Sequence, residues 1–102
     1  MHMPSRYAAG KRDDNEPQIR AVLDAYRVRY VYGHEGDGYD LMVMIGPMIE
    51  LWEVKNPAQP PAKRRLTECE KDCMAYCQKY GITYRIIETV EQANQAMAES
   101  RY

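Results

Sequence analysis

Two carboxylates and a lysine stand at the ends of two apolar segments that should pair as strands. Asp40 opens the apolar run 41–45, and Glu53 and Lys55 close the next apolar run. Side chains alternate between the faces of a strand, so Glu53 and Lys55 point the same way and Val54 points into the opposite layer. Pairing the two strands brings Asp40 to this pair. Such a group can hold a divalent cation on its carboxylates and present a lysine beside the cation.

The same three residues could instead form an ordinary salt bridge on a solvated sheet face. The glycines Gly36 and Gly38 favour a site, because glycine lets the backbone approach a ligand closely just ahead of Asp40. Burying two carboxylates and an ammonium is also costly unless the charges are paired or coordinated. His34, in the same loop, could touch a substrate phosphate or be a simple loop residue.

Hydrophobic periodicity predicts one α/β domain with the order α-β-β-β-α-β-α. Its predicted parts are a mobile arm (1–13), the domain (14–99) and a tail (100–102). Within the domain we expect a helix capped by Asn15, strands at 27–33, 39–45 and 48–56, an extended proline-rich connection, a helix opened by the capping box Thr67–Glu70, a strand at 83–88 and a final helix at 89–99. A three-strand meander followed by a helical crossover gives a mixed sheet with helices packed on it.

Composition narrows the class of protein. The chain has 102 residues, 45% of them hydrophobic, and a net charge of −1, so only a local basic patch could bind a polyanion. No apolar run is long enough to span a bilayer, and we expect a soluble, cytoplasmic protein. Cys69, Cys73 and Cys77 form one helical stripe, which favours a buried helix face in a reducing compartment over a disulfide or a zinc site.

Several short segments, in this order, resemble the PD-(D/E)xK nuclease superfamily, closest to small stand-alone phage proteins of the VRR-NUC and Holliday-junction-resolvase types. Those segments are Asn15-Glu16, Gly36–Leu41, Trp52–Lys55, Pro60–Thr67 and Thr89–Glu91. Tyr39 stands where the family usually has proline. The resemblance implies a restriction-endonuclease-like αβββαβ core with a C-terminal helix, and an endonuclease that hydrolyses phosphodiester bonds in branched or nicked DNA.

The resemblance also implies roles for residues. Asp40, Glu53, the carbonyl of Val54 and the helix-borne Glu16 would hold Mg²⁺, for which Mn²⁺ would substitute. Lys55 would orient or help deprotonate the attacking water and steady the phosphate. Helical spacing independently places Glu16 on the face of Ile19 and Leu23, although an acid is also favoured at a helix N-terminus. The remaining candidates are Lys63, Arg64 and Arg65 for DNA contacts and Glu70, where the family often has glutamine.

For so small a domain we expect a homodimer or a higher homo-oligomer, in the host cytoplasm if the gene is phage-borne. The alternative is a catalytically weak nucleic-acid-binding or host-interaction module on the same fold. A purely structural α+β domain, with surface ion pairs in place of a site, is the third interpretation.

Overall fold

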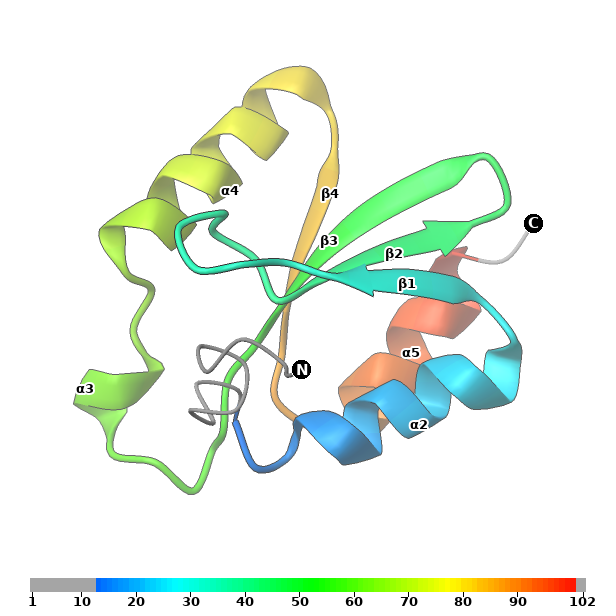
Figure 1. Cartoon of the computed structure of the whole chain (residues 1–102), viewed down its shortest axis with the longest axis horizontal. Coiled ribbons are helices and arrows are strands. Elements are labelled where there is room, and N and C mark those ends of the chain that lie inside the picture. Colours follow the sequence, from blue (N-terminus) through cyan, green and yellow to red (C-terminus); the bar gives the residue numbers. More distant parts are fainter. Residues whose placement is uncertain (1–12, 101–102) are drawn as a thin grey trace, which may run out of the picture.

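The computed structural model describes residues 13–100, which form a mixed four-stranded sheet with helices on both faces (Figure 1). The elements are α2 (Glu16–Tyr26), β1 (Arg29–Tyr32), β2 (Leu41–Ile45), β3 (Met48–Val54), α3 (Pro61–Arg64), α4 (Glu68–Tyr80), β4 (Thr83–Ile87) and α5 (Val90–Ser100). Apart from the short helix α3, this is the predicted order.

The sheet has the strand order β1-β2-β3-β4. The first three strands form an antiparallel meander, and β4 lies parallel to β3 after the crossover through α4. The predicted meander and mixed sheet are therefore confirmed. Strand ends differ by one or two residues, most clearly at Arg27: it was predicted to begin β1 but takes a left-handed conformation (φ 60°) that ends α2.

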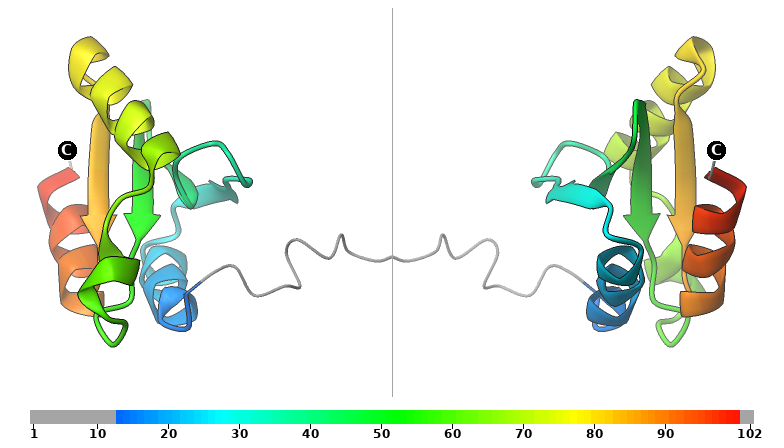
Figure 2. Two further views of the ribbon diagram at one scale, coloured as in Figure 1. Left: turned by 90° about the vertical axis from the view of Figure 1, so that its left-hand side faces the viewer. Right: turned by 90° about the vertical axis from the view of Figure 1, so that its right-hand side faces the viewer.

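Helices α2 and α5 pack together on one face of the sheet, and α4 lies on the other (Figure 1). The main core is on the α2–α5 face and includes Leu41, Val43, Trp52 and Val54 from the strands. Val54 thus points into the layer predicted for it. Figure 2 shows the arrowheads of β3 and β4 pointing toward the end of the molecule where α3 and α2 lie.

Local polar contacts explain where two of the helices begin. Thr67 and Glu70 form the predicted capping box at α4, and Thr89 and Gln92 exchange the equivalent hydrogen bonds before α5. Asn15 stands at the N-cap of α2, but its side chain makes no cap hydrogen bond, which corrects the prediction for this residue.

Three further predictions need correction. The connection after Lys55 is not wholly extended, because 61–64 form α3, with Pro61 in the first turn, where no backbone donor is needed. Ser100 is not part of a tail: it ends α5 and its hydroxyl donates to the carboxylate of Glu50 (2.5 Å). The cysteine stripe is not a fully buried face, since only Cys77 is buried and Cys69 is exposed.

The arm predicted at 1–13 lies outside the described residues except for Asp13. Within the part of the chain that the structure describes, no helix is both long and apolar enough to cross a membrane.

Candidate active site at the end of the sheet

The candidate site lies where β2 begins and β3 ends. Leu41 pairs with Trp52 in the register of the two strands. Asp40 and Glu53 are the next residues beyond this pair, one on each of the two neighbouring strand ends. The Asp40 backbone N–H donates to the Trp52 carbonyl (2.9 Å), and the Val54 N–H donates to Oδ2 of the Asp40 side chain (2.8 Å). The Asp40 carboxylate is therefore fastened to β3 by a backbone donor.

Glu53 and Lys55 lie on the same face of β3, as alternation predicts. Lys55 Nζ is 3.5 Å from Glu53 Oε2 and donates to Glu70 Oε1 at 2.9 Å. Glu53 and Lys55 are only 4% and 7% exposed, so these charges are held largely out of water. Helix α4 supplies Glu70, whose carboxylate also accepts from the Thr67 N–H (2.9 Å), so the capping box ties the helix to the lysine.

The surroundings of Glu53 strongly disfavour its negative charge. Burial and the nearby carboxylates of Asp40 and Glu70 raise the pKa of Glu53 to about 10, and the attraction of Lys55 offsets only part of this. Negative charge at this end of the sheet is thus undercompensated by the described side chains.

Lys55 and Glu70 behave as a satisfied ion pair. Burial acts to lower the pKa of Lys55, but the hydrogen bond to Glu70 and the charge of Glu53 outweigh it, and the net pKa is raised. Burial likewise opposes ionisation of Glu70, yet its hydrogen bonds from Lys55 and Thr67 leave its pKa lowered. Lys55 is therefore a stable cation whose nearest partner is Glu70.

The start of α2 is docked against the same end of the sheet. The Asn15 side-chain amide donates to the carbonyls of Lys55 (3.0 Å) and Glu88 (2.9 Å), bridging the ends of β3 and β4. Asp13 precedes it. Burial raises the pKa of Asp13 and the charge of Asp40 raises it further, while Lys55 acts in the opposite direction.

Asp13 is thus a candidate site residue that the sequence reasoning missed. Its one available signal was its position as an acid two residues ahead of the helix cap. Glu16, the acid that was predicted, is 1% exposed at the head of α2, and Arg20 Nε of the same helix lies 3.5 Å from its carboxylate. A role for Glu16 in the site remains a prediction.

Gly38 was predicted to let the backbone approach a ligand, but in the structure it lets helix α4 pack closely against the loop. A Cβ on Gly38 (φ 89°) would lie 2.6 Å from the Cys69 carbonyl oxygen and from the Cys73 Cβ, so its missing side chain admits α4 rather than a ligand. The Tyr84 hydroxyl donates to the Gly38 carbonyl at 2.7 Å and joins the loop to β4. Gly36 (φ 91°) has open space where a Cβ would be.

The other candidates lie around this cluster. In the glycine loop, the His34 N–H donates to the Asp37 carboxylate (2.8 Å), and the His34 ring also faces it. In the basic run, Arg64 donates to the Gln59 carbonyl (3.0 Å) and faces Glu88 (4.0 Å), whereas Lys63 and Arg65 are exposed.

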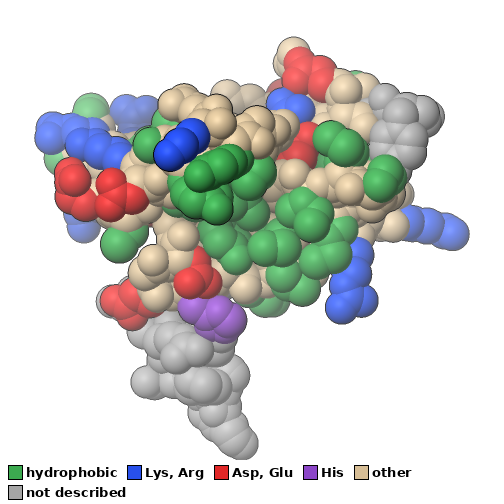
Figure 3. Space-filling model, turned by 90° about the horizontal axis from the view of Figure 1, so that it is seen from above, with side chains coloured by type: hydrophobic (Ala, Val, Ile, Leu, Met, Phe, Trp, Pro, Cys, Tyr) green, Lys and Arg blue, Asp and Glu red, His purple; other side chains and the backbone are tan. Residues whose placement is uncertain are grey.

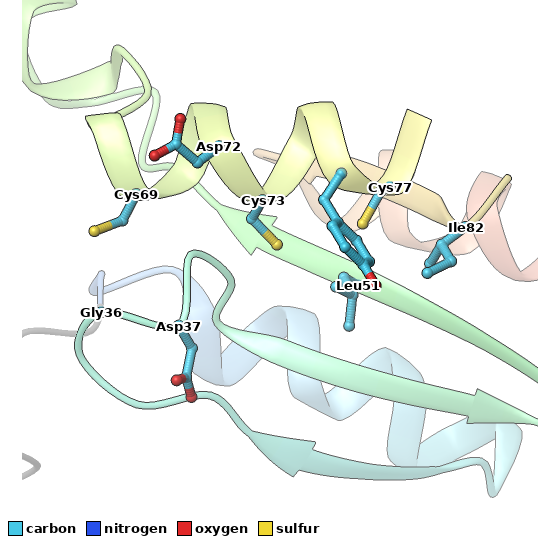
Figure 4. A pocket seen from close by; sticks show the side chains of 9 residues that line it. Gly36, Asp37, Leu51, Cys69, Asp72, Cys73, Cys77 and Ile82 are labelled. Atoms are coloured by element: carbon cyan, nitrogen blue, oxygen red, sulfur yellow. The ribbon is translucent and has the colours of Figure 1, made fainter. Parts of the chain in front are cut away.

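A groove of about 420 Å³ lies between α4 and the glycine loop (Figure 4). The cysteines of α4 point down into it, Asp37 and Gly36 lie across from them, and Leu51 of β3 is at its floor (Figure 4). Burial and the neighbouring Cys77 raise the pKa of the Cys73 thiol to about 11, so Cys73 stays protonated and has little tendency to bind metal.

The oxygen atoms at this end of the sheet fit a hard divalent cation. Mg²⁺ is usually bound through one or two carboxylates and keeps several waters as its other ligands. Here the carboxylates of Asp40 and Glu53 and the carbonyl of Val54 could be the protein ligands. The raised pKa of Glu53 indicates a position where added positive charge would be favourable. Among residues 13–100, no group of three or more His, Cys, Asp or Glu side chains is arranged to hold a metal ion, so any such site has at most two side-chain ligands from these types.

Comparison with known proteins finds no match for this chain: no family model, no curated protein and no solved structure is significantly similar to it. The case for a function therefore rests on the ordered segments and on the geometry above.

Proposed function

We propose that this protein is a Mg²⁺-dependent endonuclease that hydrolyses phosphodiester bonds in DNA, with Asp40, Glu53 and Lys55 as its central residues. The observation that carries the proposal is the buried cluster itself. Two carboxylates from neighbouring strands and one lysine share an end of the sheet, and the charge of Glu53 is left undercompensated.

The finer assignment of fold is part of the same proposal. The helix, the meander, the crossover and the parallel fourth strand agree with a restriction-endonuclease-like core followed by a C-terminal helix. Within it, Asp40 lies at the start of β2 and Glu53 and Lys55 at the end of β3, in the order of the PD-(D/E)xK pattern.

In this proposal the carboxylates of Asp40 and Glu53 would hold the cation, which would supply a lowered pKa for a bound water and positive charge beside the phosphate. Lys55, held as a cation by Glu70, donates hydrogen bonds to a phosphate oxygen and stabilises the charge that develops there. Its raised pKa makes it unsuited to be the general base. The charge of Asp13 acts on Asp40 from outside this pair of ligands, and the exposed Lys63 and Arg65 offer contacts to the DNA backbone.

The test is cleavage of supercoiled plasmid and of a synthetic four-way junction, with Mg²⁺, with Mn²⁺ and with Ca²⁺. Glu53→Gln is the inactive control, since it keeps the shape of the side chain and removes a ligand charge. We expect the native chain to cut with Mg²⁺ or Mn²⁺ and Glu53→Gln to lose about 1,000-fold in rate, or about 4 kcal/mol of barrier. Equal cutting by both proteins would refute the assignment of the site.

The second candidate is a nucleic-acid-binding module with little catalysis. It is favoured by the closed ion cluster of Lys55, Glu53 and Glu70, in which the lysine is already paired at 2.9 Å, and by the engagement of Asp40 with a backbone N–H. DNA binding that is unchanged by Mg²⁺, with no cleavage of either substrate, would favour this module over the endonuclease.

A further inference from the structure

The face of the sheet that carries Glu53 is only partly covered by the described chain. Helix α4 packs over β4, while the β1–β2 side of the same face is open. On that side Val31 is 36% exposed and Ile49 is 48% exposed, with Met42 and Met44 half-buried between them. Figure 3 shows hydrophobic side chains gathered across the middle of this part of the surface. Together with Leu51, these residues are called the open face below.

The strand register places these side chains on one surface. Val31 pairs with Met42 and Met42 with Leu51, while Arg29 pairs with Met44 and Met44 with Ile49. Directly paired residues point to the same side of a sheet, so the open face is continuous across three strands. Contiguous exposed apolar surface is one of the features that mark an interaction site.

The groove beside α4 extends the open face and indicates what kind of partner fits. Leu51 lies in both, and Tyr76, 60% exposed with its ring 4.7 Å from that of Tyr80, forms the outer wall. Within residues 13–100, the charged side chains that line the groove are Asp37 and Asp72, and no lysine or arginine lines it. Such a lining repels a phosphate backbone and favours an apolar partner with a cationic margin.

The charges at the two ends of the open face are complementary to each other. Asp37 and Asp72 lie beside the glycine loop, at the end where β3 finishes. Arg29, exposed, lies at the opposite end, beside Met44 and the β2–β3 turn. A two-fold axis that lies in the plane of the interface, perpendicular to the line that joins these two ends, places the acidic end of one copy over the basic end of the other.

We propose that the open face is the interface of a symmetric homodimer, with a second copy of this chain as its occupant. The dimer covers Val31 and Ile49 with their counterparts and pairs Arg29 of each copy with Asp72 of the other. This arrangement sets the two Glu53–Lys55 clusters at opposite ends of the shared interface. The inference does not rest on the proposed nuclease activity, because its test is the mass of the particle.

The first experiment measures mass by sedimentation equilibrium across the micromolar range, for the native chain, Ile49→Glu and Met48→Glu. Met48 is the matched control, because it is the adjacent residue, is similarly exposed (55%) and lies on the opposite side of the strand. We expect a native dimer, at least about a 100-fold weaker dimer in Ile49→Glu, because a carboxylate would be buried among apolar groups, and no change in Met48→Glu. Circular dichroism checks that both variants are folded.

A native chain that stays monomeric overturns the proposal. If Ile49→Glu then weakens binding of single-stranded DNA by the monomer, the open face is a nucleic-acid surface instead of a dimer interface. A dimer that is disrupted by Met48→Glu but not by Ile49→Glu overturns it as well, by assigning the interface to another surface.

A charge exchange tests the two-fold arrangement directly. Arg29→Glu and Asp72→Arg should each weaken the homodimer, because each variant places like charges opposite one another. Mixing the two folded variants should restore association, since each chain then supplies the charge that the other lacks at both contacts. Failure of the mixture to associate would refute the proposed orientation.

Discussion

The charged cluster predicts that Glu53→Gln stabilises the protein in the absence of metal while lowering the rate of cleavage about 1,000-fold. Glu53 is 4% exposed, and its pKa is raised from 4.5 to about 10. Folding at neutral pH therefore requires the carboxyl to take up a proton that the unfolded chain does not carry. At pH 7 this costs about 1.4 kcal/mol for each pH unit above 4.5, or about 3 kcal/mol as an upper limit.

Glutamine has nearly the same shape and needs no proton, so it avoids that cost. Lys55 keeps its closer partner, Glu70, at 2.9 Å and loses only the 3.5 Å contact. We expect Glu53→Gln to raise the free energy of unfolding by about 1–3 kcal/mol at pH 7, or the melting temperature by roughly 5 to 15 °C.

The stability difference between Glu53→Gln and the native chain should change with pH in a definite direction. A carboxyl with a raised folded-state pKa destabilises the native state increasingly as pH rises from 4.5 toward 10. The advantage of Glu53→Gln should therefore vanish near pH 4.5 and grow through neutral pH. Glu70→Gln is the matched control with the opposite sign. The folded-state pKa of Glu70 is lowered, so its charge stabilises the protein at neutral pH and that contribution is lost as pH falls through this pKa.

The assay is thermal unfolding with EDTA and then with Mg²⁺, from pH 4.5 to 9. Mg²⁺ should stabilise the native chain, by about 1.4 kcal/mol at ten times its dissociation constant, and leave Glu53→Gln unchanged. A Glu53→Gln variant that is equal to or less stable than the native chain at pH 7 in EDTA would refute the reasoning. It would mean that the Glu53 carboxylate is ionised and fully compensated, as in a structural ion cluster.

Three further predictions concern residues around Glu53. Lys55→Gln should lose about 1,000-fold in cleavage rate yet keep the Mg²⁺-induced rise in melting temperature, because the carboxylates remain; loss of both would contradict its role as a phosphate-contacting cation. Gly38→Ala should lower the free energy of unfolding by about 2–4 kcal/mol in denaturant unfolding, because the new Cβ clashes with α4 and the left-handed backbone is strained. Gly36→Ala bears only the backbone strain, about 1–2 kcal/mol. Equal effects of the two variants would contradict the close approach of α4. Asp13→Asn should weaken Mg²⁺ activation of cleavage in a metal titration more than Glu16→Gln does, because the charge of Asp13 acts on Asp40, and the reverse order would favour Glu16 over Asp13 as the acid that supports the site.

Much of the fold was predictable because it depends on local pattern. Alternation and turn residues gave the strands, and the boxes at Thr67–Glu70 and Thr89–Gln92 gave two helix starts. The pairing of Asp40 with Glu53 and Lys55 followed from the same alternation once the two strands were joined as a hairpin.

The parts that sequence reasoning missed depend on contacts between distant segments. Asn15 looks like a cap, yet its amide bonds carbonyls 40 and 73 residues away. No local pattern contains that information. Asp13 enters the site only because those bonds fix the residues beside it against β3, and Gly38 was assigned to a ligand because the approach of α4 is equally non-local.

Two buried glutamates of β3, Glu50 and Glu53, differ in how far neighbouring groups compensate their charge. Glu50 is 5% exposed and accepts hydrogen bonds from Trp52, Arg85 and Ser100. Burial alone would raise the pKa of Glu50, but these donors more than offset it, and the pKa is lowered. Glu53 lies three residues later, on the other face of the strand, and is equally buried. Its cationic partner, Lys55, is 3.5 Å away and is shared with Glu70.

The chain can therefore compensate a buried glutamate of β3 fully, with donors from β3, β4 and α5, and it leaves Glu53 undercompensated beside Asp40. Departures of this kind from structural consistency are expected at functional positions, where stability is given up for a site. A bound cation would offset the missing positive charge at Glu53 and would add nothing at Glu50. Mg²⁺ should accordingly still stabilise a Glu50→Gln variant, although that variant itself loses the bonds from Arg85. Loss of the Mg²⁺ effect in Glu50→Gln, with the fold intact, would remove the distinction between the two glutamates on which the metal site is inferred.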